Sequence, residues 1–103
     1  MRLLLARHFW GADLSAGLAT AAAAWRAAGY TAFEVCLDHV AAPDLATFHH
    51  LRRAENWGWI AGVYTDAFRT TGDVAAHLAS LRAQLEAIAA CPGPAPLLVN
   101  PHS

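Results

Sequence analysis

Short apolar runs alternate along this chain with longer segments in which apolar residues recur every three or four positions. The first three runs span Arg2 to Ala6, Ala32 to Leu37 and Trp59 to Tyr64. A fourth, within Pro96 to Ser103, predicts a buried strand that runs into a polar loop. Apolar runs of this length are typical of strands in a parallel sheet, and the intervening segments have the period of amphipathic helices. The pattern therefore predicts the order βαβαβαβ, an α/β fold with a parallel sheet.

Capping and breaking residues delimit the three predicted helices. Asp13 is the expected N-cap of the first helix, and Gly29 its expected C′ residue. Pro43 fits the first turn of the second helix, where a missing N–H costs nothing. Thr70 or Thr71 is the expected cap of the third. The expected apolar faces are Leu14, Leu18, Ala21 or Ala22, Trp25 and Ala28 in the first helix; Leu45, Phe48, Leu51 and Ala54 in the second; and Val74, Leu78, Leu81, Leu85 and Ile88 in the third.

The spacing of the strands favours half of a barrel. Strands begin about every 30 residues, and a closed (β/α)8 barrel needs about 250 residues. We therefore expect residues 1–103 to be a single N-terminal half-barrel segment, truncated after its fourth strand. A flavodoxin-like or dinucleotide-binding sheet is the alternative, but the turn at residues 7–13 has no phosphate-binding glycine run.

Composition narrows the partners and the compartment. The chain has 103 residues, of which 56% are hydrophobic and 15% charged, enough for one modest core. All seven basic residues are arginines, scattered along a chain of net charge −1, so we expect no nucleic-acid partner. Cys36 and Cys91 have no metal-ligand spacing and are expected to be free thiols. Arg7 and His8 interrupt the N-terminal apolar run before it reaches signal length, and residues 14–28 are too short to span a membrane. We therefore expect a soluble, cytoplasmic protein with no membrane partner.

The chemistry of a parallel α/β fold is found where strands end and helices begin. Polar and aromatic residues at these positions are the candidates for a site. They are His8, Trp10, Glu34, Asp38, His39, Thr65, Asp66, Asn100, His102 and Ser103.

Three segments resemble one family of barrels. Residues 29–34 read GYTAFE, residues 59–64 read WIAGVY, and residues 99–103 read VNPHS. Together they resemble the xylose isomerase-like barrels known as sugar phosphate isomerases and epimerases. The likeness extends over the whole chain but over only half of the family's barrel.

The resemblance implies a reaction class and a cofactor. It implies an aldose–ketose isomerase or epimerase that moves a proton beside a carbonyl of a small sugar or sugar phosphate. A divalent metal ion (Mn, Mg, Co or Zn) would polarise the substrate oxygens in the full-length protein. Because relatives draw their metal ligands mainly from the second half of the barrel, we assign no metal ligand here and expect this chain alone to bind no metal and to be inactive as an isomerase.

Proton abstraction beside a carbonyl needs a base and an electrophile at the oxygen. Glu34 and His102 are the candidate catalytic residues. Glu34 can equally point outward to a helix, because its neighbours on both sides are apolar, and His102 can instead cap the next helix. The candidate substrate-binding residues are His8; Trp10, with a core position as its alternative; Asp66, with a turn cap as its favoured alternative; and Asn100.

Other chemistries find little support in the sequence. It contains no GxSxG or HExxH motif, and neither cysteine has a neighbouring base. The related endonuclease IV barrels, which cut abasic DNA, are disfavoured by the absence of lysine. Two alternatives to the isomerase remain. One is a half-barrel that assembles with another copy or with a missing C-terminal half, and the other is a non-enzymatic domain that binds a partner through its exposed face.

Overall fold

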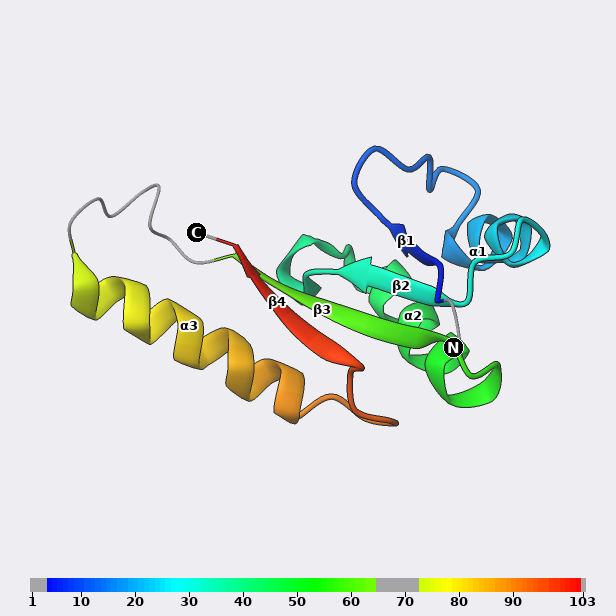
Figure 1. Cartoon of the computed structure of the whole chain (residues 1–103). Helices are drawn as coiled ribbons and strands as arrows, with labels where there is room; N and C mark the ends of the chain where they lie inside the picture. The colour runs from blue at the N-terminus through cyan, green and yellow to red at the C-terminus, as the bar shows by residue number, and fades with distance from the viewer. Residues whose placement is uncertain (1–3, 65–72, 103) are drawn as a thin grey trace.

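The structure is a computed structural model that describes residues 4–64 and 73–102, without the side chain of His102. It contains a four-stranded sheet and three α-helices that alternate along the chain (Figure 1). The predicted α/β order is therefore confirmed. The elements are β1 (Ala6–His8), α1 (Leu18–Ala27), β2 (Ala32–Val35), the short 3-10 helix η1 (Leu37–His39), α2 (Ala42–Ala54), β3 (Gly58–Tyr64), α3 (Val74–Ala89) and β4 (Leu98–His102).

The sheet is parallel throughout, and its strands lie in the order β1-β2-β3-β4. Each strand pairs with the next strand in the sequence, so no connection skips over a neighbour. The register aligns His8 with Glu34, Glu34 with Ile60, and Ile60 with Leu98. Residues aligned in this way project to the same side of a sheet.

The two faces of the sheet differ in composition. Phe33 and Trp59 are aligned with each other and are almost fully buried in the core with residues of α1 and α2. Alternation places their neighbours Glu34 and Ile60 on the opposite side, where both are only half-buried. We call this side the open face; it carries His8, Glu34, Ile60, Leu98 and Asn100.

An aromatic cluster fills the core between the sheet and the first two helices. Phe33 stacks on Trp57 with ring centroids 4.1 Å apart and an angle of 8° between the rings. Its ring also contacts Trp25 of α1, Phe48 of α2 and Phe9. Phe33 has no exposed surface, so it joins the sheet to both helices.

A buried arginine joins α2 to the loop before β4. Arg52 is only 2% exposed, and its guanidinium donates to the carbonyls of Pro92 and Pro94. The same group lies over the rings of Phe48 and Trp59, 5.2 and 4.7 Å from their centroids. Burial lowers the pKa of Arg52, and these oxygens and π-faces replace the water that the cation has lost.

Helix α1 begins later than predicted. Its N-cap is Gly17, not Asp13, whose Oδ1 instead accepts a hydrogen bond from the Ser15 N–H. An aspartate that binds a backbone N–H two residues on forms a local turn, which here competes with helix formation. Leu14 consequently lies before the helix. The predicted end is confirmed, because Gly29 adopts φ +103° and its N–H bonds the carbonyl of Arg26.

Helix α3 buries only part of the side that its apolar stripe predicted. Ile88 is buried as expected, but Val74, Leu78 and Leu85 are 69%, 57% and 41% exposed. Leu81 packs against the core as well, and Gln84, one turn before Ile88, is also buried. The side-chain amide of Gln84 accepts a hydrogen bond from the Tyr64 N–H and donates one to the Tyr64 carbonyl. Tyr64 is the last residue of β3.

The position of Gln84 has a physical cause in the sheet. Pairing of β2 with β3 ends at Val35, because the chain turns into η1 after Cys36. Tyr64 lies beyond that point, and the Gln84 amide satisfies its backbone groups in place of a strand. Buried backbone groups must find such partners, and this requirement decides which side of α3 meets the sheet. The cap of α3 is Asp73, whose side chain accepts from the Ala76 N–H; Thr70 and Thr71 lie outside the described residues.

Replacing Gln84 with leucine is expected to destabilise the fold by about 1–3 kcal/mol, because the two hydrogen bonds between its amide and the Tyr64 backbone are lost. Urea denaturation monitored by circular dichroism measures the change. Arg82→Leu, at an exposed position of the same helix, is the control and is expected to change stability by less than about 0.5 kcal/mol. Equal stabilities of the two variants would show that the amide does not hold the end of β3.

His49 predicts a loss of stability in acid. Its Nδ1 is buried without a hydrogen-bond partner among the described residues. Burial, followed by the charges of Arg52 and Arg53, lowers the pKa of His49 below its usual 6.5. The unfolded chain therefore binds more protons below about pH 6.5, so this contribution is fully present above that pH and is lost as pH falls. We expect His49→Gln to lose less stability than the wild type between pH 7 and 5 in urea titrations, whereas the exposed control His50→Gln follows the wild type.

The structure differs from the predicted strands in some boundaries and in the burial of β4. β1 runs from Ala6 to His8, so it continues two residues beyond the predicted end at Ala6, and Arg2 and Leu3 lie outside the described residues. β2 ends at Val35, since Leu37 begins η1. The residues of β4 are not buried as expected: Leu98 and Val99 are largely exposed, because no further strand or helix of the described chain covers them. The third strand, predicted at Trp59, begins at Gly58 and ends at Tyr64 as expected.

Two smaller predictions are also answered. Cys36 and Cys91 are both free thiols, as the sequence indicated. Pro43 lies in the first turn of α2, as predicted, and that helix ends at Ala54, the last residue of its predicted apolar face. None of the helices in the described part of the chain is long and apolar enough to cross a membrane.

Candidate functional site

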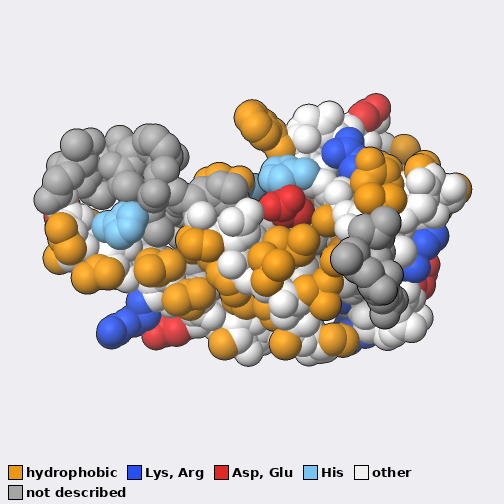
Figure 2. Space-filling model, in the orientation of Figure 1, with side chains coloured by type: hydrophobic (Ala, Val, Ile, Leu, Met, Phe, Trp, Pro, Cys, Tyr) orange, Lys and Arg blue, Asp and Glu red, His pale blue; other side chains and the backbone are white. Residues whose placement is uncertain are grey.

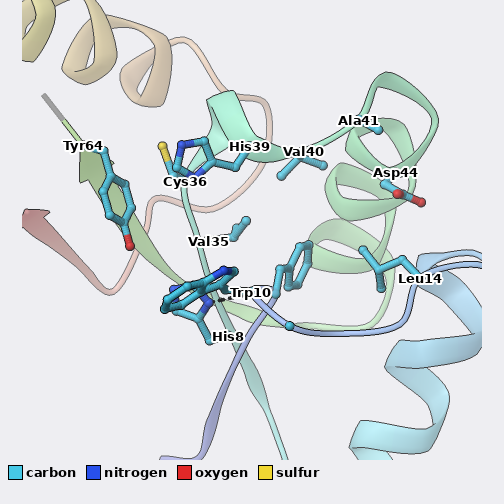
Figure 3. A pocket seen from close by; sticks show the side chains of 12 residues that line it. His8, Trp10, Leu14, Val35, Cys36, His39, Val40, Ala41, Asp44 and Tyr64 are labelled. Carbon is cyan, nitrogen blue, oxygen red and sulfur yellow. Dashed lines mark hydrogen bonds between the residues drawn. The ribbon is translucent and has the colours of Figure 1, made fainter. Parts of the chain in front are cut away.

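A cavity of about 510 Å³ opens at the carboxyl ends of the first three strands (Figure 3). It lies between the loop after β1, the η1 segment after β2, and the last residue of β3. Ligand sites of parallel α/β folds lie at this end of the sheet. The described residues that line the cavity are His8, Phe9, Trp10, Gly11, Leu14, Val35, Cys36, His39, Val40, Ala41, Asp44 and Tyr64.

His8 is the residue that belongs to both the cavity and the open face. It ends β1, where it is aligned with Glu34 in the neighbouring strand. Its Nδ1 accepts a hydrogen bond of 2.8 Å from the Trp10 N–H. Because Nδ1 acts as an acceptor, the proton of the neutral ring is carried by Nε2, which is available as a donor. The sequence predicted that His8 follows the first strand, whereas in the structure it is the last residue of β1, and pairing with β2 fixes its position.

Glu34 projects from the open face. One of its carboxylate oxygens, Oε1, accepts a hydrogen bond of 3.1 Å from Nδ2 of Asn100 in β4. The side chain reaches past β3 at Gly62, which is aligned with Asn100 and has no side chain of its own. The alternative in which Glu34 bonds a neighbouring helix is therefore wrong, since its partner lies on the sheet. Glu34 and Asn100, predicted separately from two strands, form one polar pair.

Trp10 is not part of the core. Its side chain is 87% exposed, which excludes the alternative of a core position. The ring lies edge-on to His8, with centroids 6.4 Å apart, and lines the cavity (Figure 3). The backbone hydrogen bond from Trp10 to His8 fixes where this aromatic ring leaves the chain.

Sequence reasoning missed Tyr64 and Cys36 as cavity residues, whereas it did name His39. The ring of Tyr64 lies over Gly62, since a Cβ built at that glycine would be 3.4 Å from Cε2 of the tyrosine. His39 packs against Tyr64 with ring centroids 5.0 Å apart. Cys36 lines the cavity as well, and burial raises the pKa of its thiol. Tyr64 was overlooked because it ends an apolar strand, although it occupies the same carboxyl-terminal position as His8.

The remaining candidates are only partly placed. His102 is the last residue of β4 and is aligned with Tyr64, so it lies within the strand and not beyond its end as expected. Asp66, Thr65 and Ser103 lie outside the described residues. Asp38, in η1, is exposed and does not line the cavity.

The donor set for a metal ion is incomplete in this part of the chain. Within residues 4–64 and 73–101, no three His, Cys, Asp or Glu side chains lie close enough together to hold one. Glu34 and His8 supply at most two ligands from neighbouring strands. We therefore derive no step of a mechanism through a metal.

No family model, curated protein or solved structure matches this chain. The resemblance to xylose isomerase-like barrels therefore rests on the three sequence segments and stays a prediction.

Proposed function

We propose that this chain is the first half of a (β/α)8 barrel of the xylose isomerase-like kind. Two features of the fold support the proposal. The strands follow one another in sequence order across a parallel sheet, as successive βα units of a barrel do. The aromatic core lies on one side of the sheet only, which leaves the other side to become the inside of a closed barrel.

We propose that the polar residues of the open face belong to a site that moves a proton beside a carbonyl of a small sugar-like substrate. The observation that carries this is the half-buried Glu34 carboxylate, held by Asn100 and aligned with His8. A carboxylate in such a place is suited to act as a general base. A neutral histidine with its proton on Nε2 is suited to bind a carbonyl oxygen.

The proposed roles follow from these contacts. Glu34 removes a proton from the carbon beside the carbonyl, and the electrons of that C–H bond form a carbon–carbon double bond. The carbonyl oxygen gains the negative charge, which the Nε2–H of His8 stabilises by donating a hydrogen bond. Asn100 holds one oxygen of Glu34, so that the other is directed at the substrate. To complete an isomerisation, the hydroxyl proton of the neighbouring carbon passes to the charged oxygen, a new carbonyl forms on that hydroxyl-bearing carbon, and Glu34 returns its proton to the former carbonyl carbon. An epimerisation would instead need a second acid that delivers a proton to the opposite face of the first carbon.

A divalent metal ion belongs to the proposal for the complete barrel only. Such an ion polarises the substrate oxygens when it is bound. Its further ligands would come from strands of the second half, as the resemblance implies. We therefore do not expect this chain alone to catalyse full isomerase turnover. We do expect it to bind the reacting part of the substrate and to exchange its C–H proton.

Binding of an enediol analogue tests the proposal. Glycolohydroxamate resembles the enediol, and transition-state analogues bind at least about 100-fold more tightly than the corresponding substrates. We therefore expect it to bind the 103-residue chain more tightly than dihydroxyacetone does, with NMR shifts in the side chains of His8 and Asn100. Equal affinities, or shifts confined to other residues, would reject the proposed site.

Assembly is the second candidate function, favoured by the exposure of the edge strand. Leu97, Leu98 and Val99 are 57%, 51% and 40% exposed, and hydrophobic side chains gather along β4 and α3 (Figure 2). Exposed apolar edge strands pair with other chains. Another copy of the chain could pair through this edge.

Sedimentation velocity distinguishes assembly from an isolated chain. If the edge mediates assembly, the wild type sediments as a dimer or larger species and Leu98→Lys sediments as a monomer, because a charge at the edge opposes pairing. Ala46→Lys, at an exposed position of α2, is the control and should not change the oligomeric state. A monomeric wild type would remove this candidate.

A further inference from the structure

The cavity beside the polar pair has an apolar character that the proposed reaction does not require. Phe9, Leu14, Val35 and Val40 supply aliphatic and aromatic surface to it. The rings of Trp10, next to His8, and of Tyr64, next to His39, also line it (Figure 3). We call these six residues, Phe9, Trp10, Leu14, Val35, Val40 and Tyr64, the apolar subsite.

The charges around the cavity disfavour an anionic ligand. No arginine is among the described residues that line it, and the chain contains no lysine. The acidic side chain of Asp44 is present instead. Phosphate groups are normally bound by arginine or lysine, or by the free N–H groups of a helix N-terminus.

The N-terminus of α2 borders the cavity, but it is poorly suited to bind a phosphate group. Ala41, its N-cap, and Asp44, in its first turn, both line the cavity. Pro43, between them, has no N–H to donate. The carboxylate of Asp44 adds negative charge at the place where an anion would bind. This helix terminus therefore opposes a phosphate.

The size and position of the cavity also bear on the ligand. Its volume of about 510 Å³ falls within the usual range of about 300–1,000 Å³ for small-molecule sites. A three-carbon hydroxyketone would fill little of it. His8 lines the cavity and is aligned with Glu34, so one ligand can place its carbonyl at this pair and a substituent in the cavity.

We infer that the apolar subsite binds a ring-bearing, unphosphorylated substituent of the substrate, so that the substrate is a neutral hydroxycarbonyl compound with an apolar ring. This inference rests on the proposed function for the position of the carbonyl. It differs from that function in naming what occupies the cavity. An aromatic or alicyclic ring fits because it can stack on Trp10, whose face is exposed.

Three matched ligands test the inference. Dihydroxyacetone, its phosphate and its phenyl ether share the same hydroxyketone and differ only in the third carbon's substituent. Isothermal titration or NMR titration of the full chain at pH 8, where free histidine is neutral, gives the three dissociation constants. We expect the phenyl ether to bind at least about 10-fold more tightly than dihydroxyacetone, because burial of a ring is worth that much or more. Tightest binding by the phosphate, or no gain from the phenyl group, would overturn the inference.

Two variants locate the effect in the cavity. Trp10→Ala is expected to remove most of the preference for the phenyl ether and to fold normally, because the ring is 87% exposed. Asp44→Asn is expected to improve binding of the phosphate while the phenyl ether is bound as before. A phenyl preference that survives Trp10→Ala at full size would contradict the assignment of the ring to this cavity.

The outcomes separate the inference from the proposed function. Tight binding of the phenyl ether with no binding of glycolohydroxamate at His8 would retain the subsite and reject the proton-transfer site. The reverse result would retain the proton-transfer site and reject the subsite.

Discussion

Replacement of Glu34 with glutamine is expected to reduce the exchange of the dihydroxyacetone C–H protons in D2O to the rate of buffer alone. The wild-type chain is expected to accelerate this exchange, because a positioned general base contributes about 10²–10⁴-fold. Glutamine keeps the size of Glu34 and can accept the hydrogen bond from Asn100 through its carbonyl oxygen. It cannot take up a proton, so the acceleration is lost while the local structure is retained. NMR detection of the residual C–H signal with time measures both rates.

Two further variants make this result specific. Asn100→Ala is expected to slow exchange by about 10-fold or less, because it frees the carboxylate without removing it. Glu55→Gln, an exposed carboxylate that follows α2, is the matched control and should exchange like the wild type. If Glu34→Gln exchanged as fast as the wild type, Glu34 would not be the base.

Replacement of Phe33 with alanine is expected to cost about 3–5 kcal/mol of folding stability. Phe33 has no exposed surface and stacks on Trp57 at 4.1 Å, while its ring edge meets rings from both α1 and α2. Its loss leaves a cavity at the point where the sheet and two helices meet. Small domains are stable by only about 5–15 kcal/mol, so this single change should bring the chain close to unfolding at room temperature.

Urea denaturation, followed by circular dichroism and by tryptophan fluorescence, measures this loss. Phe33→Leu is the conservative comparison and should cost less, because it retains much of the buried volume. Trp10→Ala removes a larger but exposed aromatic ring and should change stability by less than about 0.5 kcal/mol. A Phe33→Ala protein as stable as the wild type would contradict the placement of this cluster at the centre of the core.

The order of elements could be predicted from the sequence because it depends on short-range signals. Apolar runs separated by amphipathic segments determine the alternation of strand and helix, and Gly29 and Pro43 mark a helix end and a helix start by backbone geometry alone. These features require no knowledge of partners distant in sequence. The parallel sheet follows from the alternation.

The errors arise where distant partners decide. The side of α3 that meets the sheet is set by Gln84, whose partner Tyr64 lies 20 residues away in the sequence. The start of α1 was misplaced because Asp13 binds Ser15, a local turn that competes with a cap. An apolar stripe and a capping residue are therefore sufficient to predict a helix, but not its buried side or its first residue.

The candidate site was predicted in part for the same reason. The positions of His8, Trp10, Glu34 and Asn100 near strand ends identified them as candidates, because the carboxyl ends of parallel strands all lie at the same edge of the sheet. The direction of Glu34 could not be predicted, since it depends on the register that aligns it with His8 and on the absence of a side chain at Gly62. Both are properties of the assembled sheet.

Glu34, Asn100 and His8 lie together on the side of the sheet opposite the aromatic core. Nuclear Overhauser effects in a uniformly 13C- and 15N-labelled chain measure this directly. The structure predicts cross-peaks between the Asn100 side-chain amide and the Glu34 side chain, whose bonded atoms are 3.1 Å apart, and between the β-protons of Glu34 and those of His8. Cross-peaks from Glu34 to the side chains of Phe48 or Trp25 in their place would put the carboxylate on the helix side and contradict the account.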